Sequence, residues 1–245
     1  MGSIKNCFEL ENGGNVPVLL SCPHGGFKKP LMIPNRKKNS LPDRNTLFLA
    51  RRIIYLLKTK NIKLYYVLSK IHRSKVDLNR PPGSASAFDQ DCSEAREIHY
   101  FFHDQIKKIA RECVSKYNRC LVIDLHGFTK PRKDYCDVIL GNIFSNTLNI
   151  KTGTNYGDYR DYWGLYQIVT EISKNFSFDD GLGVREDNLA YSGGYITHKF
   201  YRKERINAIQ MELANTIRND LKLANQFVDD FTKAIIKSIK YERDK

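Results

Sequence analysis

The sequence predicts an α/β fold, a three-layer α/β/α sandwich with helices on both faces of a mostly parallel or mixed central sheet. Short apolar runs alternate along the chain with longer segments whose apolar residues recur every three or four positions. The clearest run, 119–125, has a continuous apolar centre, as expected of a strand buried on both faces. A chain of 245 residues can bury a sizeable core, so we expect one domain over residues 1–245.

The first predicted elements surround two loops. Residues 16–22 form a short apolar run that ends in Pro-His-Gly-Gly, which indicates a buried strand entering a loop. A helix is expected to begin after Asp43, a residue type that favours the N-cap, because apolar residues then follow at helical spacing. Residues 63–68 are a second strand candidate, and the two prolines in 80–84 indicate an exposed loop.

The second half of the chain continues the alternation. A long amphipathic helix is expected at 92–117, directly before the strand at 119–125. The remaining elements are a strand at 135–141, a helix at 165–175, a strand at 207–213 and a C-terminal helix with Val228, Phe231, Ile235 and Ile239 on its apolar face. Because ligands in such sheets collect beyond the carboxyl ends of the strands, the loops after 16–22 and 119–125 are the expected place for a site.

Composition excludes several classes of protein. Hydrophobic residues make up 41% and charged residues 27%, which is ordinary globular usage. The chain has no apolar run long enough to span a membrane, and its start lacks the order of a secretory signal, so we expect a cytoplasmic protein without a membrane partner. Six scattered cysteines predict neither a disulfide framework nor a zinc-thiolate site, and Cys22 and Cys120 are expected to be buried thiols.

The formal net charge of +13 has three interpretations. The simplest is a lysine-rich solvated surface. A second is steering of an anionic substrate, because Lys28, Lys29, Arg36, Lys37 and Lys38 follow the first of the two loops. Nucleic-acid binding is disfavoured, since no helix-turn-helix, zinc-finger or RNP signature accompanies the charge.

Polar residues suited to metal-dependent amide hydrolysis cluster in a few short segments. His24 and His126 each follow a predicted strand, and glycines beside them permit close approach. A catalytic zinc takes about three nitrogen or oxygen ligands from the protein and leaves one position open. Arg80, in Val-Asp-Leu-Asn-Arg, has the guanidinium that binds a carboxylate bidentately, and Glu212 lies among apolar neighbours, where a carboxylate is costly unless it is partnered or functional.

These segments together resemble the N-formylglutamate amidohydrolase family, which is related to the zinc carboxypeptidases and aspartoacylases. Each motif alone is weak, but they occur in family order over about residues 18–215. They are Pro23-His24-Gly25-Gly26, Asp43-x-x-Thr46-x-x-Leu49-Ala50, Arg73-x-x-Val76-Asp77-Leu78-Asn79-Arg80-Pro81-Pro82, Asp124-Leu125-His126, Gly153-Thr154-Asn155-x-Gly157, Gly193-Gly194-Tyr195-Ile196-Thr197 and Gln210-Met211-Glu212. The resemblance implies a zinc-carboxypeptidase-like (phosphorylase/hydrolase-like) fold and a small anionic N-acyl amino acid as substrate, with N-formyl-L-glutamate giving formate and glutamate.

The resemblance also implies which residues hold a metal, zinc or another divalent cation. His24 and His126 are the expected ligands. The related carboxypeptidase pattern has a glutamate ligand three residues after the first histidine, but this chain has Phe27 there, which cannot ligate. Asp43 is the substitute we expect, unless it serves only as a helix N-cap.

The remaining roles follow the same motifs. Asn79 and Arg80 are expected to bind the substrate's α-carboxylate, with Arg73 on a second carboxylate or the developing oxyanion. Glu212 is the expected general base. Substrate contacts are also expected from Gly194, Tyr195 and Thr197, and from Asn155, although both glycine segments also resemble ordinary turns. Asp77 and Asp124 are candidates to orient the histidine ligands.

Competing interpretations remain at this point. His99 and His103 are four residues apart on one helix face, a spacing that can chelate zinc, but they lack the HExxH order and are expected on a solvated or partly buried face. The chain could also be a carboxypeptidase-like enzyme acting on short peptides. A non-catalytic binder of anions or nucleic acid that keeps the fold is the alternative from another class, favoured by the change at Phe27.

Overall fold

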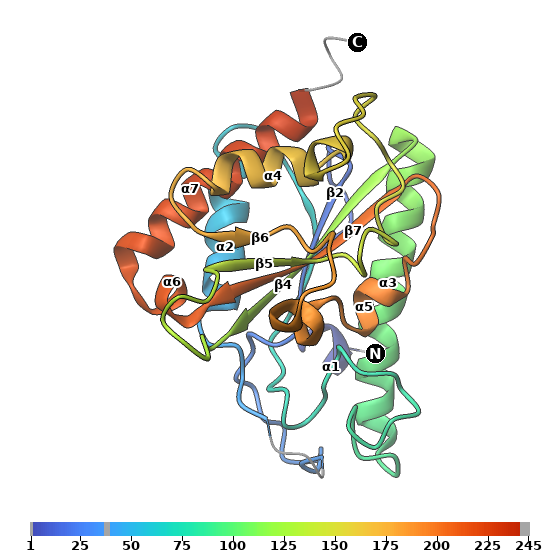
Figure 1. Cartoon of the computed structure of the whole chain (residues 1–245). Helices are drawn as coiled ribbons and strands as arrows, with labels where there is room; N and C mark the ends of the chain where they lie inside the picture. Colours follow the sequence, from blue (N-terminus) through green and yellow to red (C-terminus); the bar gives the residue numbers. More distant parts are fainter. Residues whose placement is uncertain (1, 37–39, 241–245) are drawn as a thin grey trace.

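A computed structural model describes residues 2–36 and 40–240 (Figure 1). Seven strands form one mixed sheet in the order β1-β3-β2-β4-β7-β5-β6. The strands are β1 (Phe8–Glu11), β2 (Val18–Cys22), β3 (Tyr65–Ser69), β4 (Cys120–Phe128), β5 (Val138–Gly141), β6 (Phe178–Asp179) and β7 (Ile206–Ala214). β3, β2, β4 and β7 are parallel neighbours. β1 runs antiparallel to β3, and β5 runs antiparallel to β7 but parallel to β6. The predicted α/β fold with a mixed sheet is confirmed.

Helices cover both faces of the sheet, as the three-layer prediction requires (Figure 1). One core cluster packs α3 (Ser93–Tyr117) on one face. A second packs α2 (Thr46–Lys58), α4 (Leu165–Ile172) and α7 (Leu221–Lys240) on the other. Shorter helical segments are α1 (Gly2–Lys5), η1 (Tyr159–Asp161), η2 (Glu186–Tyr191), α5 (Tyr195–His198) and α6 (Asn215–Asn219).

The central pair of strands is longer than the sequence predicted. β4 and β7 pair in parallel over nine positions, from Cys120 opposite Ile206 to Phe128 opposite Ala214. His126 therefore lies within β4, and its expected position in a loop after the strand was wrong. The pairing also sets His126 opposite Glu212, which brings a predicted metal ligand and the predicted base into adjacent register.

Long periodic elements match their predictions, and short ones do not. α3 begins one residue after the start of the predicted 92–117 segment and ends at the same residue, because its apolar stripe covers the full length. β1 and β6 were not predicted: β1 is four residues of an edge strand with two glutamates, and β6 is two residues. Segments this short have too few positions to establish a period.

The structure describes all six cysteines and the long helices of the chain. None of the six cysteines, all of them in the described part of the chain, forms a disulfide bond, and Cys22 and Cys120 are fully buried. Within the described residues, no helix is long and apolar enough to cross a bilayer.

Candidate active site

The first site loop follows β2 and is held against neighbouring backbone. Cys22 ends the strand, and His24 comes two residues later. The loop passes so close to the end of β3 that a Cβ on Gly26 would lie 2.2 Å from the carbonyl carbon of Lys70. Only glycine fits this approach, which fixes the position of the His24 backbone. The backbone N–H of Asp43 donates to the carbonyl of His24 at 3.0 Å, so the segment returning from the loop is fixed beside it.

Two histidines and one aspartate converge at the carboxyl ends of β2 and β4. Asp43 Oδ2 lies 3.4 Å from His24 Nδ1 and 3.3 Å from His126 Nδ1. One ligand atom from each of the three lies within 4.8 Å of the others, and all three side chains are buried. Asp43 is not the helix N-cap: that position is Asn45, at φ 67°. Of the two roles left open for Asp43, the geometry supports the ligand.

Two further carboxylates orient the histidines. Asp77 Oδ1 lies 2.7 Å from His24 Nε2, and Asp124 Oδ2 lies 2.8 Å from His126 Nε2. A proton on each Nε2 satisfies these contacts, so each Nδ1 can direct its lone pair at the cluster. The second oxygen of Asp124 accepts a hydrogen bond from Ser21 at 2.6 Å. These partners are the ones predicted from the sequence.

The cluster has the donor atoms that a divalent cation requires, and one of them lacks a hydrogen-bond partner among the described residues. His24 Nδ1 is buried and makes no hydrogen bond with any described residue. A buried nitrogen without a partner is costly, and a cation would remove that cost. Two imidazole nitrogens and one carboxylate oxygen are ligands that zinc accepts, and three protein ligands leave a position open for chemistry. The residues therefore fit a catalytic metal site.

The site's electrostatics show how strongly its groups interact. Burial alone would raise the pKa of Asp43, but the imidazoles of His126 and His24, 3.3 and 3.4 Å from its carboxylate, hold that pKa well below its usual value. Burial alone would lower the pKa of His126, yet Asp124, Asp43 and Glu212 raise it well above its usual value. The pocket thus stabilises positive charge on the His126 imidazole, and a bound cation would take the place of that charge.

Two arginines form ion pairs with the carboxylates of Asp43 and Asp77. Arg73 pairs with Asp43 Oδ1 at 3.2 Å and with Asp77 Oδ2 at 3.0 Å. Arg36 pairs with the same oxygen of Asp77 at 3.2 Å and donates to the carbonyl of Arg73 at 2.6 Å. Arg36, named among the basic residues that could steer an anionic substrate, is buried instead. Lys28 and Lys29 are exposed as expected, whereas Lys37 and Lys38 lie outside the described residues.

Glu212 lies beside the histidine cluster on β7. It is 7% exposed, and burial raises its pKa to about 7. Gln210 Nε2 donates to Glu212 Oε1 at 2.9 Å and fixes the carboxylate. Both face a cavity of about 240 Å³. Its lining residues are His24, Asp43, Arg73, Asn79, Arg80, His126, Gly127, Phe128, Ala190, Tyr191, Gly193, Gly194, Gln210 and Glu212.

A network of amides connects the cavity to α5. Asn79 Oδ1 accepts from the backbone N–H of Ile196 at 2.9 Å, and Asn79 Nδ2 donates to Gln210 Oε1 at 3.2 Å. The same oxygen of Gln210 accepts from Gly194 N–H at 2.7 Å. Gln210 was not among the predicted site residues, although it lies two residues before Glu212 and so on the same face of the strand. That spacing was the signal that could have identified it.

The structure brings together some of the predicted substrate contacts. Arg80 is exposed at the edge of the cavity, and Gly194 lines it. Asn155 is exposed elsewhere, and neither it nor Thr197 is among the cavity's lining residues. Tyr195 lines a separate groove.

Comparison with known proteins agrees with this geometry. The model of the N-formylglutamate amidohydrolase family matches residues 87–217, more than half of the chain. The chain belongs to this family. The matched span includes His126 and Glu212, whereas His24 and Asp43 precede it. No curated protein sequence matches the chain significantly.

Solved structures share the fold of this amidohydrolase-family member. N-formylglutamate amidohydrolase from Ralstonia eutropha superposes with a TM-score of 0.69 at 14% identity, covering 97% of this chain and 98% of that one. A gene product from Agrobacterium tumefaciens has a TM-score of 0.67 at 16% identity, with 98% and 96% covered. At these identities the likeness establishes the fold.

Proposed function

We propose that this protein is a metal-dependent hydrolase that cleaves the amide bond of a small N-acyl amino acid, with N-formyl-L-glutamate as the reference substrate. Family membership supports amide hydrolysis. The proposed metal dependence and mechanism rest on one observation. His24, Asp43 and His126 form a buried cluster beside Glu212, in one cavity. All these residues come from one sheet and its loops, so we propose that residues 1–245 act as a single amidohydrolase domain.

His24 Nδ1, His126 Nδ1 and an oxygen of Asp43 would hold the metal. When bound, zinc or another divalent cation polarises the acyl carbonyl and acidifies water. Asp77 and Asp124 keep the two imidazoles in the tautomer and orientation that ligation needs. Arg73 and Arg36 fix Asp77 in turn, and Arg73 also contacts Asp43. In this assignment Arg73 is a positioning residue first, because its two terminal nitrogens already contact carboxylates.

Glu212 acts as the general base. It accepts a proton from the attacking water and later passes that proton to the leaving nitrogen, so that formate and the free amine are produced. Gln210 holds the carboxylate by its hydrogen bond at 2.9 Å. The burial of Glu212 keeps bulk water from competing for the proton.

Arg80 binds the carboxylate of the amino acid. Its exposed guanidinium at the cavity edge can form two parallel hydrogen bonds with a planar carboxylate. Asn79 contributes mainly by position, because both its polar atoms already bond to protein groups. The small cavity suits an acylated amino acid better than a peptide, which ranks the carboxypeptidase-like alternative second.

Product analysis with metal determination tests the proposal. Tag-free protein loaded with zinc is expected to hold about one metal per chain and to release formate from N-formyl-L-glutamate. His126→Ala should lose both. Release of a C-terminal amino acid from dipeptides, without formate from the acyl substrate, would favour the peptidase. Absence of bound metal and of both activities would favour a non-catalytic binder.

A further inference from the structure

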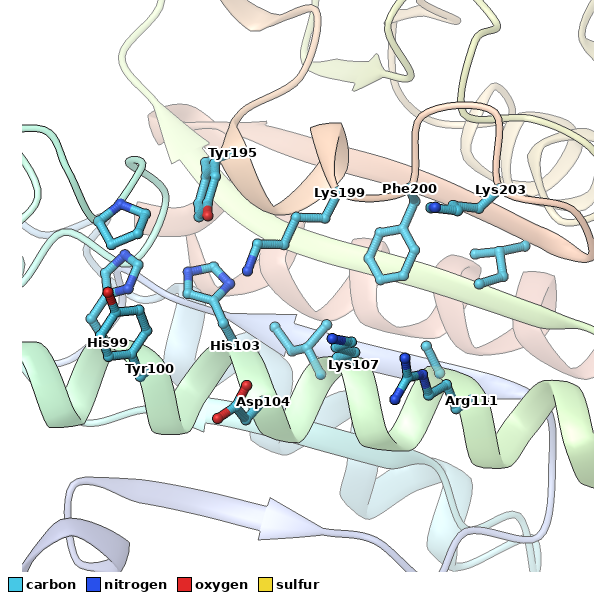
Figure 2. Close-up of a pocket in the computed structure, with 14 residues that line it drawn as sticks. His99, Tyr100, His103, Asp104, Lys107, Arg111, Tyr195, Lys199, Phe200 and Lys203 are labelled. Carbon is cyan, nitrogen blue, oxygen red and sulfur yellow. The ribbon is translucent and has the colours of Figure 1, made fainter.

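A second cavity, of about 550 Å³, lies between α3 and the segment that connects α5 to β7 (Figure 2). We call it the α3 groove. It shares no lining residue with the catalytic cavity. Its volume falls within the range of about 300–1,000 Å³ that is usual for small-molecule sites, so it has room for a ligand of its own.

Two buried imidazoles close the α3 groove at the end nearest the Asp77–Arg80 motif. Nε2 of His99 bonds to the carbonyl of Arg80, and Nε2 of His103 bonds to that of Leu78, at 2.9 Å in both cases. The two imidazoles are 0% and 3% exposed, not on the solvated or partly buried face expected from the sequence, and their Nδ1 atoms are buried as well. They therefore form a wall and offer no hydrogen-bonding atom to a ligand.

Two tyrosines give this end an aromatic surface that a ligand can reach. The ring centroid of Tyr195 lies 5.0 Å from that of His103, and the ring centroid of Tyr100 lies 6.1 Å from that of His99. Both tyrosines line the groove; Tyr100 is 49% exposed and Tyr195 is half-buried. Because aromatic rings favour contact with the faces and edges of other rings, this end suits a flat apolar body.

Four exposed cations line the α3 groove beside and beyond the tyrosines. Lys107 and Arg111 come from α3, and Lys199 and Lys203 come from the facing segment (Figure 2). Lys107 and Arg111 are four residues apart on the helix, so they are separated by about 6 Å along its axis. Figure 2 shows Lys199 extending from the facing segment toward α3. The groove thus has positive charge on both of its walls.

These cations have little negative charge to balance them. Asp104 has the one carboxylate among the lining residues, and none of the four cations forms an ion pair with a carboxylate that the structure describes. Burial and the nearby Lys107 lower the pKa of Lys199, although Asp104 acts in the opposite direction. Since like charges repel, an anion in the groove would be stabilised by the excess of cations.

A ligand that joins a flat apolar body to a negative charge would match both parts of the groove. Its body would lie against Tyr100 and Tyr195, and its anionic group would lie among the cations, where Arg111 can offer a guanidinium fork. We propose that the α3 groove is a binding site for a small aromatic anion. The proposal does not depend on the hydrolase activity, because no residue of the catalytic cavity takes part.

Three matched compounds separate the two contacts. Titration calorimetry of the full chain would compare 1-naphthyl phosphate with 1-naphthol, which lacks the anion, and with inorganic phosphate, which lacks the ring. Naphthol is expected to bind about tenfold more weakly or worse, because hydrogen bonds to a charged group are lost. Burial of about 100 Å² of ring corresponds to about 50- to 100-fold in Kd, so phosphate should bind more weakly by that factor. Naphthyl phosphate that binds no more tightly than either compound would overturn the proposal.

Variants at exposed positions locate the bound anion. Arg111→Ala and Lys203→Ala each remove one lining cation and are expected to weaken the binding of naphthyl phosphate about tenfold. Lys108→Ala removes the same charge from an exposed position on α3 outside the lining, and should leave the Kd unchanged. Arg80→Ala, at the catalytic cavity, should also leave it unchanged, so the result is separate from that of the hydrolase tests. An unchanged Kd in the first two variants, or a weakened Kd in Arg80→Ala, would refute the location.

Discussion

Substitution of the proposed general base, Glu212, tests the mechanism most directly. Glu212→Gln replaces a carboxylate oxygen with an amide nitrogen at nearly constant volume. The side chain can still accept the hydrogen bond that Gln210 Nε2 donates at 2.9 Å to Glu212 Oε1. No cavity forms in the buried strand, so we expect the free energy of unfolding to change by about 1 kcal/mol or less. The three metal ligands are untouched.

The rate effect is much larger than the stability effect. A positioned general base contributes about 100- to 10,000-fold, which is about 2.7–5.4 kcal/mol of transition-state free energy. Glu212 lies opposite His126 in the β4–β7 register, and no other carboxylate lines the cavity apart from the ligand Asp43. No described group can replace it, so the upper part of that range is expected for kcat.

Formate release from N-formyl-L-glutamate measures kcat, and elemental analysis measures metal on the same samples. Glu171→Gln is the matched control, because Glu171 is also a buried glutamate but lies on α4, paired with Lys174 and Lys237. The control should keep its kcat, and Glu212→Gln should keep its metal. If Glu212→Gln retained more than about a hundredth of wild-type kcat, the loss would fall short of the smallest general-base effect, and the assigned role would be refuted.

Three further predictions concern Asp124, Arg80 and His103. Asp124→Asn should weaken zinc affinity about 10- to 100-fold, by competition with a chromophoric chelator, because His126 loses its orienting carboxylate. Arg80→Ala should raise KM about tenfold or more with little change in metal content, since hydrogen bonds to a charged group are lost; an unchanged KM would exclude Arg80 as the carboxylate anchor. The pKa of His103 is lowered by burial and Lys199, so its neutral form stabilises the fold above the unfolded pKa of about 6.5. The unfolding free energy should therefore decline as pH falls below that value, and the decline should be smaller in His103→Gln.

Local sequence patterns predicted the elements but not the contacts that make the site. The apolar run of β4 and the stripe of α3 follow from periodicity alone. The meeting of His24 with His126 depends on β2 and β4 being parallel neighbours, which no local pattern encodes. The carboxyl-end rule for α/β sheets predicted it, because it concerns the whole sheet.

Residues that the sequence misjudged had a local signal that tertiary packing overrode. His99 and His103 belong to a helix rich in charged residues, and a solvated or partly buried face was expected for them, whereas both are fully buried. The motif loop that carries Asn79 and Arg80 covers them, and it uses their Nε2 protons to satisfy its carbonyls. Arg36 was similarly grouped with the lysines that follow it as a residue that could steer a substrate. It is buried instead, where it pairs with Asp77 and donates to two backbone carbonyls.

The change at Phe27 illustrates how the site can lack the family-related ligand position and still offer three candidate ligands. Phe27 is 59% exposed, and its ring lies against His72 at 6.4 Å between centroids, so this position faces away from the cluster. Asp43 reaches the cluster instead because its backbone is bonded to His24 and its carboxylate to Gly127 N–H at 3.1 Å. A charge buried there would be costly without Arg73 on its other oxygen. The proposed ligand role of Asp43 and the contact that Arg73 makes with its other oxygen therefore belong to one arrangement, and the departure at Phe27 gives no support to a non-catalytic protein.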